Sequence, residues 1–209
     1  MKLDDLLQRR GLPRADRLLV GAAATLPGAD WTAFAAWLTA AQEHQLPRGE
    51  MEELLLQSVL FCGFPRAIDA FKVLGSAWPA ASPPSGGGIA PENRFGEGQK
   101  LFRSIYAQHD ATVRTMLRGH HQELHDFVLE SAYGRILARP GLDAGRRELL
   151  ALAQLAALDQ ASQFRAHAHG ARNLGVAVAA LNEMVTTACS VAGISRDRWA
   201  ALLPGAAPA

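Results

Sequence analysis

Two polar residues stand where the spacing of a helix calls for apolar ones. Glu148 shares a helix face with Leu152 and Leu155, at positions i, i+4 and i+7. His167 shares a face with Phe164 on the following apolar segment. Both side chains should therefore point into the core, where an unpaired carboxylate is costly and must pair, become protonated or line a cavity. A carboxylate beside an imidazole is also a pair that can move a proton near neutral pH.

The segments around this pair predict two helices joined by a short turn. Asp143 is a suitable N-cap for the helix that carries Glu148. Asp159 or Ser162 could cap the helix that carries His167, and Gly175 should end it. A bland interpretation of the pair stays open, because an inward histidine is often a hydrogen-bonded core residue and Glu148 could bridge two helices through an arginine.

The rest of the chain predicts further helices and no strand, because β-branched residues are scarce and alternating polarity is absent. We therefore expect an all-α fold. The predicted helices are 3–10, 14–25, 31–44, 49–63, 65–74, 100–108, 110–119, 121–137, 177–191 and 195–203.

A segment rich in Pro, Gly and Ser divides the chain of 209 residues. We predict a first helical unit at 1–75, a linker at 76–98 and a second helical unit at 99–209. The sequence leaves open whether the linker only joins the two units or folds over a pocket as a lid.

An offset of 130 positions aligns the two halves without a gap, which indicates an internal repeat. Matching pairs include Arg17 with Arg147, Phe34 with Phe164, Glu53 with Glu183, and Gly63 with Gly193. The halves differ where chemistry would occur: Leu18 takes the place of Glu148, and Trp37 takes the place of His167. We interpret this as a degenerate structural copy followed by a copy that carries the candidate site.

Composition limits the class of protein. Hydrophobic residues make up 49% and charged residues 20%, and the formal net charge is +1, so nothing suggests nucleic acid or a membrane as a partner. Cys62 and Cys189 form no CxxC motif, which argues against a disulfide framework, a zinc site or a dithiol centre. The N-terminus has no apolar signal-peptide region, and we expect a cytoplasmic protein.

The run from His120 to His125 offers a second, weaker constellation. His121 and His125 are one helical turn apart, as two metal ligands on a helix would be. The pattern is HxExH, however, and not the HExxH of zinc peptidases, so the glutamate is misplaced for that mechanism. We expect a polar helix face here and no metal site.

Two stretches resemble the carboxymuconolactone decarboxylase family. ELLLQSVLFCGFPRAIDAF, from Glu53 to Phe71, is similar to an ExLLQxAxYxGxPxAxxA signature. AYGRILARPGLDAGRRELLALAQLAAL and QFRAHAHGARNLGV, between Ala132 and Val176, resemble a WGxxWxRPGLxxxxR segment followed by LRxHxxxAxxNGV. Together the stretches cover about a third of the chain.

The resemblance implies an AhpD-like helical fold, assembly into a ring such as a trimer of two-repeat chains, and no cofactor. It implies cofactor-free acid–base chemistry, the decarboxylation of a small carboxylated lactone or related acid. Glu148 and His167 would be catalytic, and Arg139 and Arg147 would bind the anionic substrate. The peroxidase branch carries a CxxCxxxH motif, but this chain has Gln160 and Gln163 at the cysteine positions, so thiol peroxidase chemistry is not expected. A non-catalytic scaffold or small-molecule-binding module of the same fold is the alternative.

Overall fold

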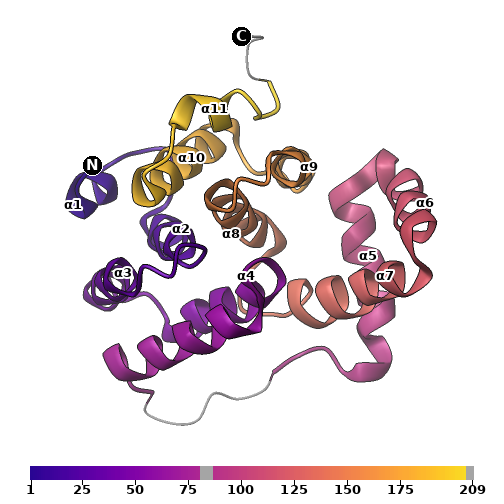
Figure 1. Cartoon of the computed structure of the whole chain (residues 1–209), viewed down its shortest axis with the longest axis horizontal. Coiled ribbons are helices and arrows are strands. Elements are labelled where there is room, and N and C mark those ends of the chain that lie inside the picture. The colour runs from indigo at the N-terminus through magenta and orange to yellow at the C-terminus, as the bar shows by residue number, and fades with distance from the viewer. Residues whose placement is uncertain (81–86, 206–209) are drawn as a thin grey trace.

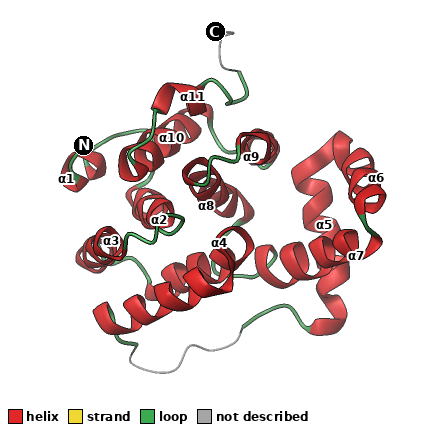
Figure 2. Ribbon diagram, in the orientation of Figure 1, coloured by secondary structure: helices red, strands yellow, loops and turns green. Residues whose placement is uncertain are grey.

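The computed structural model describes residues 1–80 and 87–205, which contain helices, turns and loops and no strand (Figures 1 and 2). The all-α class is therefore confirmed. The α-helices are α1 (Leu3–Leu7), α2 (Arg14–Thr25), α3 (Trp31–Glu43), α4 (Arg48–Ala77), α5 (Arg94–Tyr106), α6 (Asp110–His120), α7 (Gln122–Phe127), α8 (Ala144–Ala157), α9 (Ala161–Asn173), α10 (Val178–Ala192) and α11 (Arg196–Ala200). The other helical elements are two short 3₁₀-helices, η1 (Pro91–Asn93) and η2 (Ala107–His109), and the π-helix η3 (Val128–Leu137).

Helices α2 and α8 form the centre of the main core. They pack on each other, and α3, α4, α9 and α10 surround them (Figure 1). Both helices are buried over most of their length, and many of the buried positions are alanine, which lets neighbouring helices approach closely. Glu148 is thus placed on the most deeply buried helix of the second half.

Helices α5, α6 and α7 and the π-helix η3 form an arm beside the main core (Figure 1). The arm has its own apolar cluster, in which Phe102 and Tyr133 are buried members. Helix α9 lies between the arm and the main core, and the Asn173 side-chain amide donates a hydrogen bond of 2.8 Å to the Ile105 carbonyl of α5. His167 is therefore carried by the helix at which core and arm meet.

Glycines allow α5 and η3 to cross with their backbones in contact. A Cβ at Gly98 would lie 1.8 Å from the Leu129 carbonyl oxygen, and one at Gly134 would lie 1.9 Å from the Arg94 carbonyl oxygen. No other residue fits at such a distance. The crossing fixes the position of η3, and with it Tyr133, relative to α5.

Helix α4 is bent at Gly63, whose φ of 76° and ψ of 170° are not helical, and Pro65 follows in the next turn. The sequence predicts two helices that separate at this glycine, and the break lies there. By length and composition alone α4 could cross a membrane. Its contacts with α3 and α8, and buried residues such as Met51 and Leu54, instead make it a helix of the main core.

Other local predictions differ from the structure. Helix α5 begins at Arg94, inside the segment predicted as linker, and residues 81–86 of that segment lie outside the described residues. The helix predicted at 121–137 turns into a π-helix after Phe127. Neither Asp159 nor Ser162 caps α9: Gln160 occupies the N-cap without a side-chain hydrogen bond, and Asp159 has a left-handed φ of 59°.

Two equivalent ion pairs join the two halves of the chain. Arg17 of the first half binds Glu183 of the second at 3.1 Å, and Arg147 of the second half binds Glu53 of the first at 2.8 Å. The partners correspond to each other at the offset of 130. This reciprocity is what two copies related by an approximate two-fold axis would produce. It supports the internal repeat, which stays our interpretation.

Candidate acid–base site

Glu148 and His167 are held by two antiparallel helices joined by a three-residue turn. The Asp143 carboxylate caps α8 by accepting a hydrogen bond of 3.0 Å from the Arg146 amide, as the sequence predicts. Glu148 lies in the second turn of α8, and its side chain is 1% exposed. Gly170 of α9 lies close enough that a Cβ there would be 3.1 Å from Glu148 Oε2. A small residue at 170 therefore lets α9 bring its histidine to the carboxylate.

The structure brings the two side chains into direct contact. His167 Nδ1 lies 2.9 Å from Glu148 Oε2. A carboxylate only accepts hydrogen bonds, so Nδ1 carries the proton and donates it, and Nε2 is left for another molecule. The His167 side chain is 13% exposed, and the ring of Phe61 meets it edge to face, with centroids 5.9 Å apart. Glu148 and Phe61 together fix the orientation of the imidazole.

The environment favours the charged form of His167. Burial alone would lower the pKa of this imidazole, but the negative charge of Glu148 and the hydrogen bond to it outweigh burial and raise the pKa above the ordinary 6.5. His167 is thus a proton donor that remains protonated further into the neutral pH range than a free histidine.

Two tyrosines of the arm share this electrostatic environment. The Tyr133 hydroxyl donates to the Tyr106 hydroxyl at 3.2 Å. Burial raises the pKa of both phenols, and the negative charge of Glu148 raises both further. They stay protonated at neutral pH, and the Tyr106 proton is free to be donated onward. Sequence reasoning missed both as site residues, because only the packing of the arm on α9 brings them near the pair.

A cavity of about 230 Å³ opens beside Tyr106. Its lining comes from α5, η2, α6 and α9 and consists of Ile105, Tyr106, His109, Val113, Ala166, His169 and Asn173. Tyr106 therefore faces both this cavity and the charge of Glu148. Three residues of α9 line this cavity, Ala166, His169 and Asn173, whereas Glu148 and His167 are not part of its lining.

The two arginines predicted as substrate ligands are bound to Glu53 of α4. The Arg139 Nη2 atom lies 2.8 Å from Glu53 Oε1, and Arg147 Nη2 lies 2.8 Å from Glu53 Oε2. Burial raises the pKa of Glu53, but hydrogen bonds and charges from both arginines outweigh it and hold that pKa below its ordinary value. A substrate-binding role for either arginine stays a prediction.

Arg147 is almost completely buried, since its side chain is 1% exposed. Besides Glu53, its guanidinium donates to the Leu142 carbonyl, the Gln57 side chain and the Arg139 carbonyl. Burial lowers the pKa of this guanidinium even though Glu53 raises it. These contacts give Arg147 a clear task in joining α4, α8 and the segment before α8.

Other candidates from the sequence are occupied elsewhere. Cys62 and Cys189 are free thiols, and burial raises the pKa of each to about 11, which disfavours a reactive thiolate. His121 caps α7 by accepting from the Glu123 amide, and His125 Nδ1 bonds to Asp126. Within residues 1–80 and 87–205, no group of three or more His, Cys, Asp or Glu residues could hold a metal ion.

Comparisons with known proteins show which family the second half of the chain resembles. The model of the carboxymuconolactone decarboxylase family matches residues 122–204, a range that contains both Glu148 and His167. A 4-carboxymuconolactone decarboxylase of Acinetobacter baylyi is 27% identical over 104 residues, which are 49% of this chain and 78% of that protein.

Proposed function

We propose that the chain is a decarboxylase-like acid–base catalyst, because residues 122–204 match the model of the carboxymuconolactone decarboxylase family. Its substrate would be a small carboxylated lactone or a related acid. The observation that carries the proposal is the hydrogen bond of 2.9 Å between His167 and Glu148, at the positions where the family resemblance expects a catalytic pair.

The proposed reaction needs one proton donor. When the carbon–carbon bond to the carboxylate breaks, carbon dioxide leaves and the electron pair stays on the substrate as a carbanion or enolate. His167 then donates the proton on Nε2 to that carbon and is reprotonated from water. Glu148 holds the ring through Nδ1 and favours the imidazolium before the transfer.

The tyrosines would support the same step. The pKa of Tyr106 is raised, so its phenol is protonated, and its oxygen already accepts from Tyr133. Its own proton can therefore be donated to a developing enolate oxygen. In this proposal Tyr106 touches the substrate, while Tyr133 positions Tyr106.

The test is His167→Gln with a carboxylated muconolactone as substrate, following decarboxylation by absorbance. General acid catalysis contributes roughly 10²–10⁴-fold, so kcat/KM should fall by at least about a hundredfold while the thermal melt shifts by only a few degrees. His120→Gln is the matched control, because His120 is an exposed histidine at the end of α6 that does not line the cavity beside Tyr106. Full turnover in His167→Gln, or an equal loss in His120→Gln, would contradict the proposal.

One observation favours the alternative of a non-catalytic binding module. Phe61 packs against a His167 ring that is largely buried, as it would in a site that has closed. Under that alternative, replacing both partners with leucine (Glu148→Leu together with His167→Leu) should leave the free energy of unfolding unchanged or raise it, because a change of only one partner would leave the other buried and unpaired. Clear destabilisation in urea unfolding would count against a closed module.

A further inference from the structure

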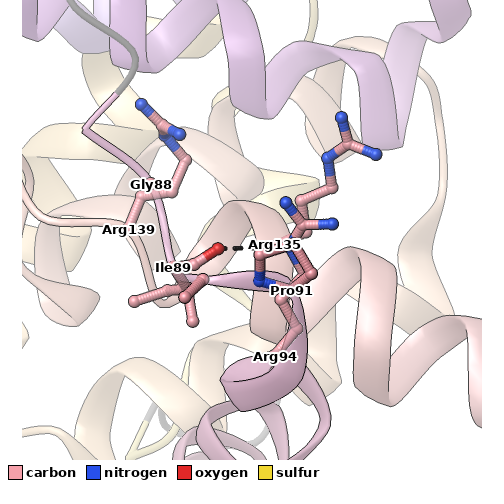
Figure 3. A pocket seen from close by; sticks show the side chains of 7 residues that line it. Gly88, Ile89, Pro91, Arg94, Arg135 and Arg139 are labelled. Carbon is pink, nitrogen blue, oxygen red and sulfur yellow. Dashed lines mark hydrogen bonds between the residues drawn. The ribbon is translucent and has the colours of Figure 1, made fainter.

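Two adjoining cavities on the arm side of α4 share Arg135 and Arg139. The first has a volume of about 320 Å³ and is polar, and the second, of about 340 Å³, is largely apolar. Gly88, Ile89, Ala90, Pro91 and Arg94 complete the first (Figure 3). Leu56, Val59, Leu60, Phe64, Phe127, Ser131 and Ile136 complete the second. Because Arg135 and Arg139 line both, the two cavities adjoin, one polar and the other apolar.

The backbone holds the arginines of the polar end in place. Gly134 of η3 packs directly on the Arg94 backbone, since a Cβ added at Gly134 would lie 1.9 Å from the Arg94 carbonyl oxygen. Arg135 follows Gly134, so the crossing of α5 and η3 brings Arg135 next to Arg94. Arg139 follows η3, four residues beyond Arg135. Figure 3 shows the three side chains around the pocket, with the Arg94 Nε atom bonded to the Ile89 carbonyl at 3.2 Å.

The positive charge at this end exceeds the negative charge that faces it. Glu53 pairs with Arg139, and the same carboxylate also serves Arg147. In the part of the chain that the structure describes, no ion pair joins Arg94 or Arg135 to a carboxylate. Arg94 and Arg135 both line the polar cavity, and a planar anion can accept hydrogen bonds from two guanidinium groups at once.

The other end exposes apolar side chains to solvent. Phe64 is 70% exposed and Phe127 is 62% exposed, although both are large and aromatic. Leu60 lies deeper, where it packs against the apolar cluster of the arm. Exposed aromatic residues in a concave wall are typical of a surface that something covers.

We propose that the two cavities together bind a carboxylate that carries an apolar chain. The carboxylate lies between Arg94 and Arg135, and the chain extends along Phe64 and Phe127. Charge complementarity at one end and the exposed apolar wall at the other select this ligand over a bare anion or a neutral lipid. The linings contain neither Glu148 nor His167, so this site is additional to the acid–base site.

The first experiment is calorimetric titration of the full chain with dodecanoate, held below its micelle concentration. Arg135→Gln should raise the Kd for dodecanoate at least tenfold, which corresponds to a loss of about 1.4 kcal/mol in binding free energy. Arg103→Gln is the matched control, because Arg103 is an exposed arginine on α5 that lines neither cavity. Equal affinities for dodecanoate in both variants, or no binding to the unsubstituted chain, would overturn the proposal.

A second variant separates a ligand site from an interface between copies of the chain. Phe64→Ser should weaken dodecanoate binding and leave the mass measured by light scattering unchanged. The apolar wall is instead an interface between copies if Phe64→Ser converts an oligomer into a monomer and dodecanoate does not bind. That outcome would also overturn the proposal.

Discussion

Replacing Glu148 with Gln tests the pair through the stability of the folded chain. The Gln amide has nearly the shape of the Glu148 carboxylate, and its oxygen can still accept a hydrogen bond from His167 Nδ1. In the unsubstituted chain that nitrogen lies 2.9 Å from Glu148 Oε2. Only the charge is lost. A hydrogen bond to a charged group contributes about 1.5–3 kcal/mol and a neutral one about 0.5–1.5 kcal/mol. The expected loss is therefore about 1–1.5 kcal/mol while the histidine is charged.

The loss should depend on pH with a definite sign. Because the folded chain raises the pKa of His167 above 6.5, the pair stabilises fully below pH 6.5 and loses this contribution as pH rises through the folded value. Glu148→Gln should therefore destabilise at pH 6. At pH 9 it should be neutral or stabilising, since a buried carboxylate then faces a neutral ring.

Thermal unfolding at pH 6 and pH 9 measures this difference. For a chain of this length 1 kcal/mol shifts Tm by about 2–4 °C, so Tm should fall by roughly 2–6 °C at pH 6. In a His167→Gln background, Glu148→Gln should lose its pH dependence, because the partner that titrates is gone. A deficit that is equal at both pH values, or larger at pH 9, would refute the reasoning that Glu148 stabilises an imidazolium.

Two further predictions concern the ion pairs and the thiols. Glu53→Ala leaves Arg139 and the buried Arg147 without a carboxylate and should lower the free energy of unfolding in urea by about 3–5 kcal/mol at pH 7. Because the folded chain lowers the pKa of Glu53, this loss should shrink as pH falls below 4.5. A loss under about 1 kcal/mol at pH 7 would contradict the prediction. Cys62, with a pKa of about 11, should react slowly with iodoacetamide at pH 7.5 until the chain is unfolded, and rapid labelling of the native chain would show an accessible thiolate.

Helical periodicity was sufficient to predict the all-α class and the inward direction of Glu148 and His167. A period of 3.6 residues decides which residues share a face, whatever the helix packs against. The short turn between α8 and α9 makes them antiparallel neighbours, so two inward residues on them meet. That geometry is local in the sequence, and local patterns predict it well.

Arg147 shows where local patterns fail. The family resemblance predicted that it binds an anionic substrate, yet its side chain is buried and pairs with Glu53, 94 residues earlier. No spacing within α8 could reveal a partner on α4. The offset of 130 did contain a signal, because Arg17 and Glu183 repeat the same two residue types, and a charge retained in both halves indicates a pair inside the fold.

The arm explains why the acid–base pair occurs in one half only. At the position 130 residues before His167 the chain has Trp37, which is buried with its ring on Gly21, so close that a Cβ there would lie 2.4 Å from the ring. An apolar ring fills that space, so the first half has no polar group there. In the second half the arm borders α9 instead and supplies Tyr106 and Tyr133, whose polar hydroxyls can accompany a charged pair. A buried ion pair is tolerated where neighbouring groups compensate it, and the arm is the element that provides them.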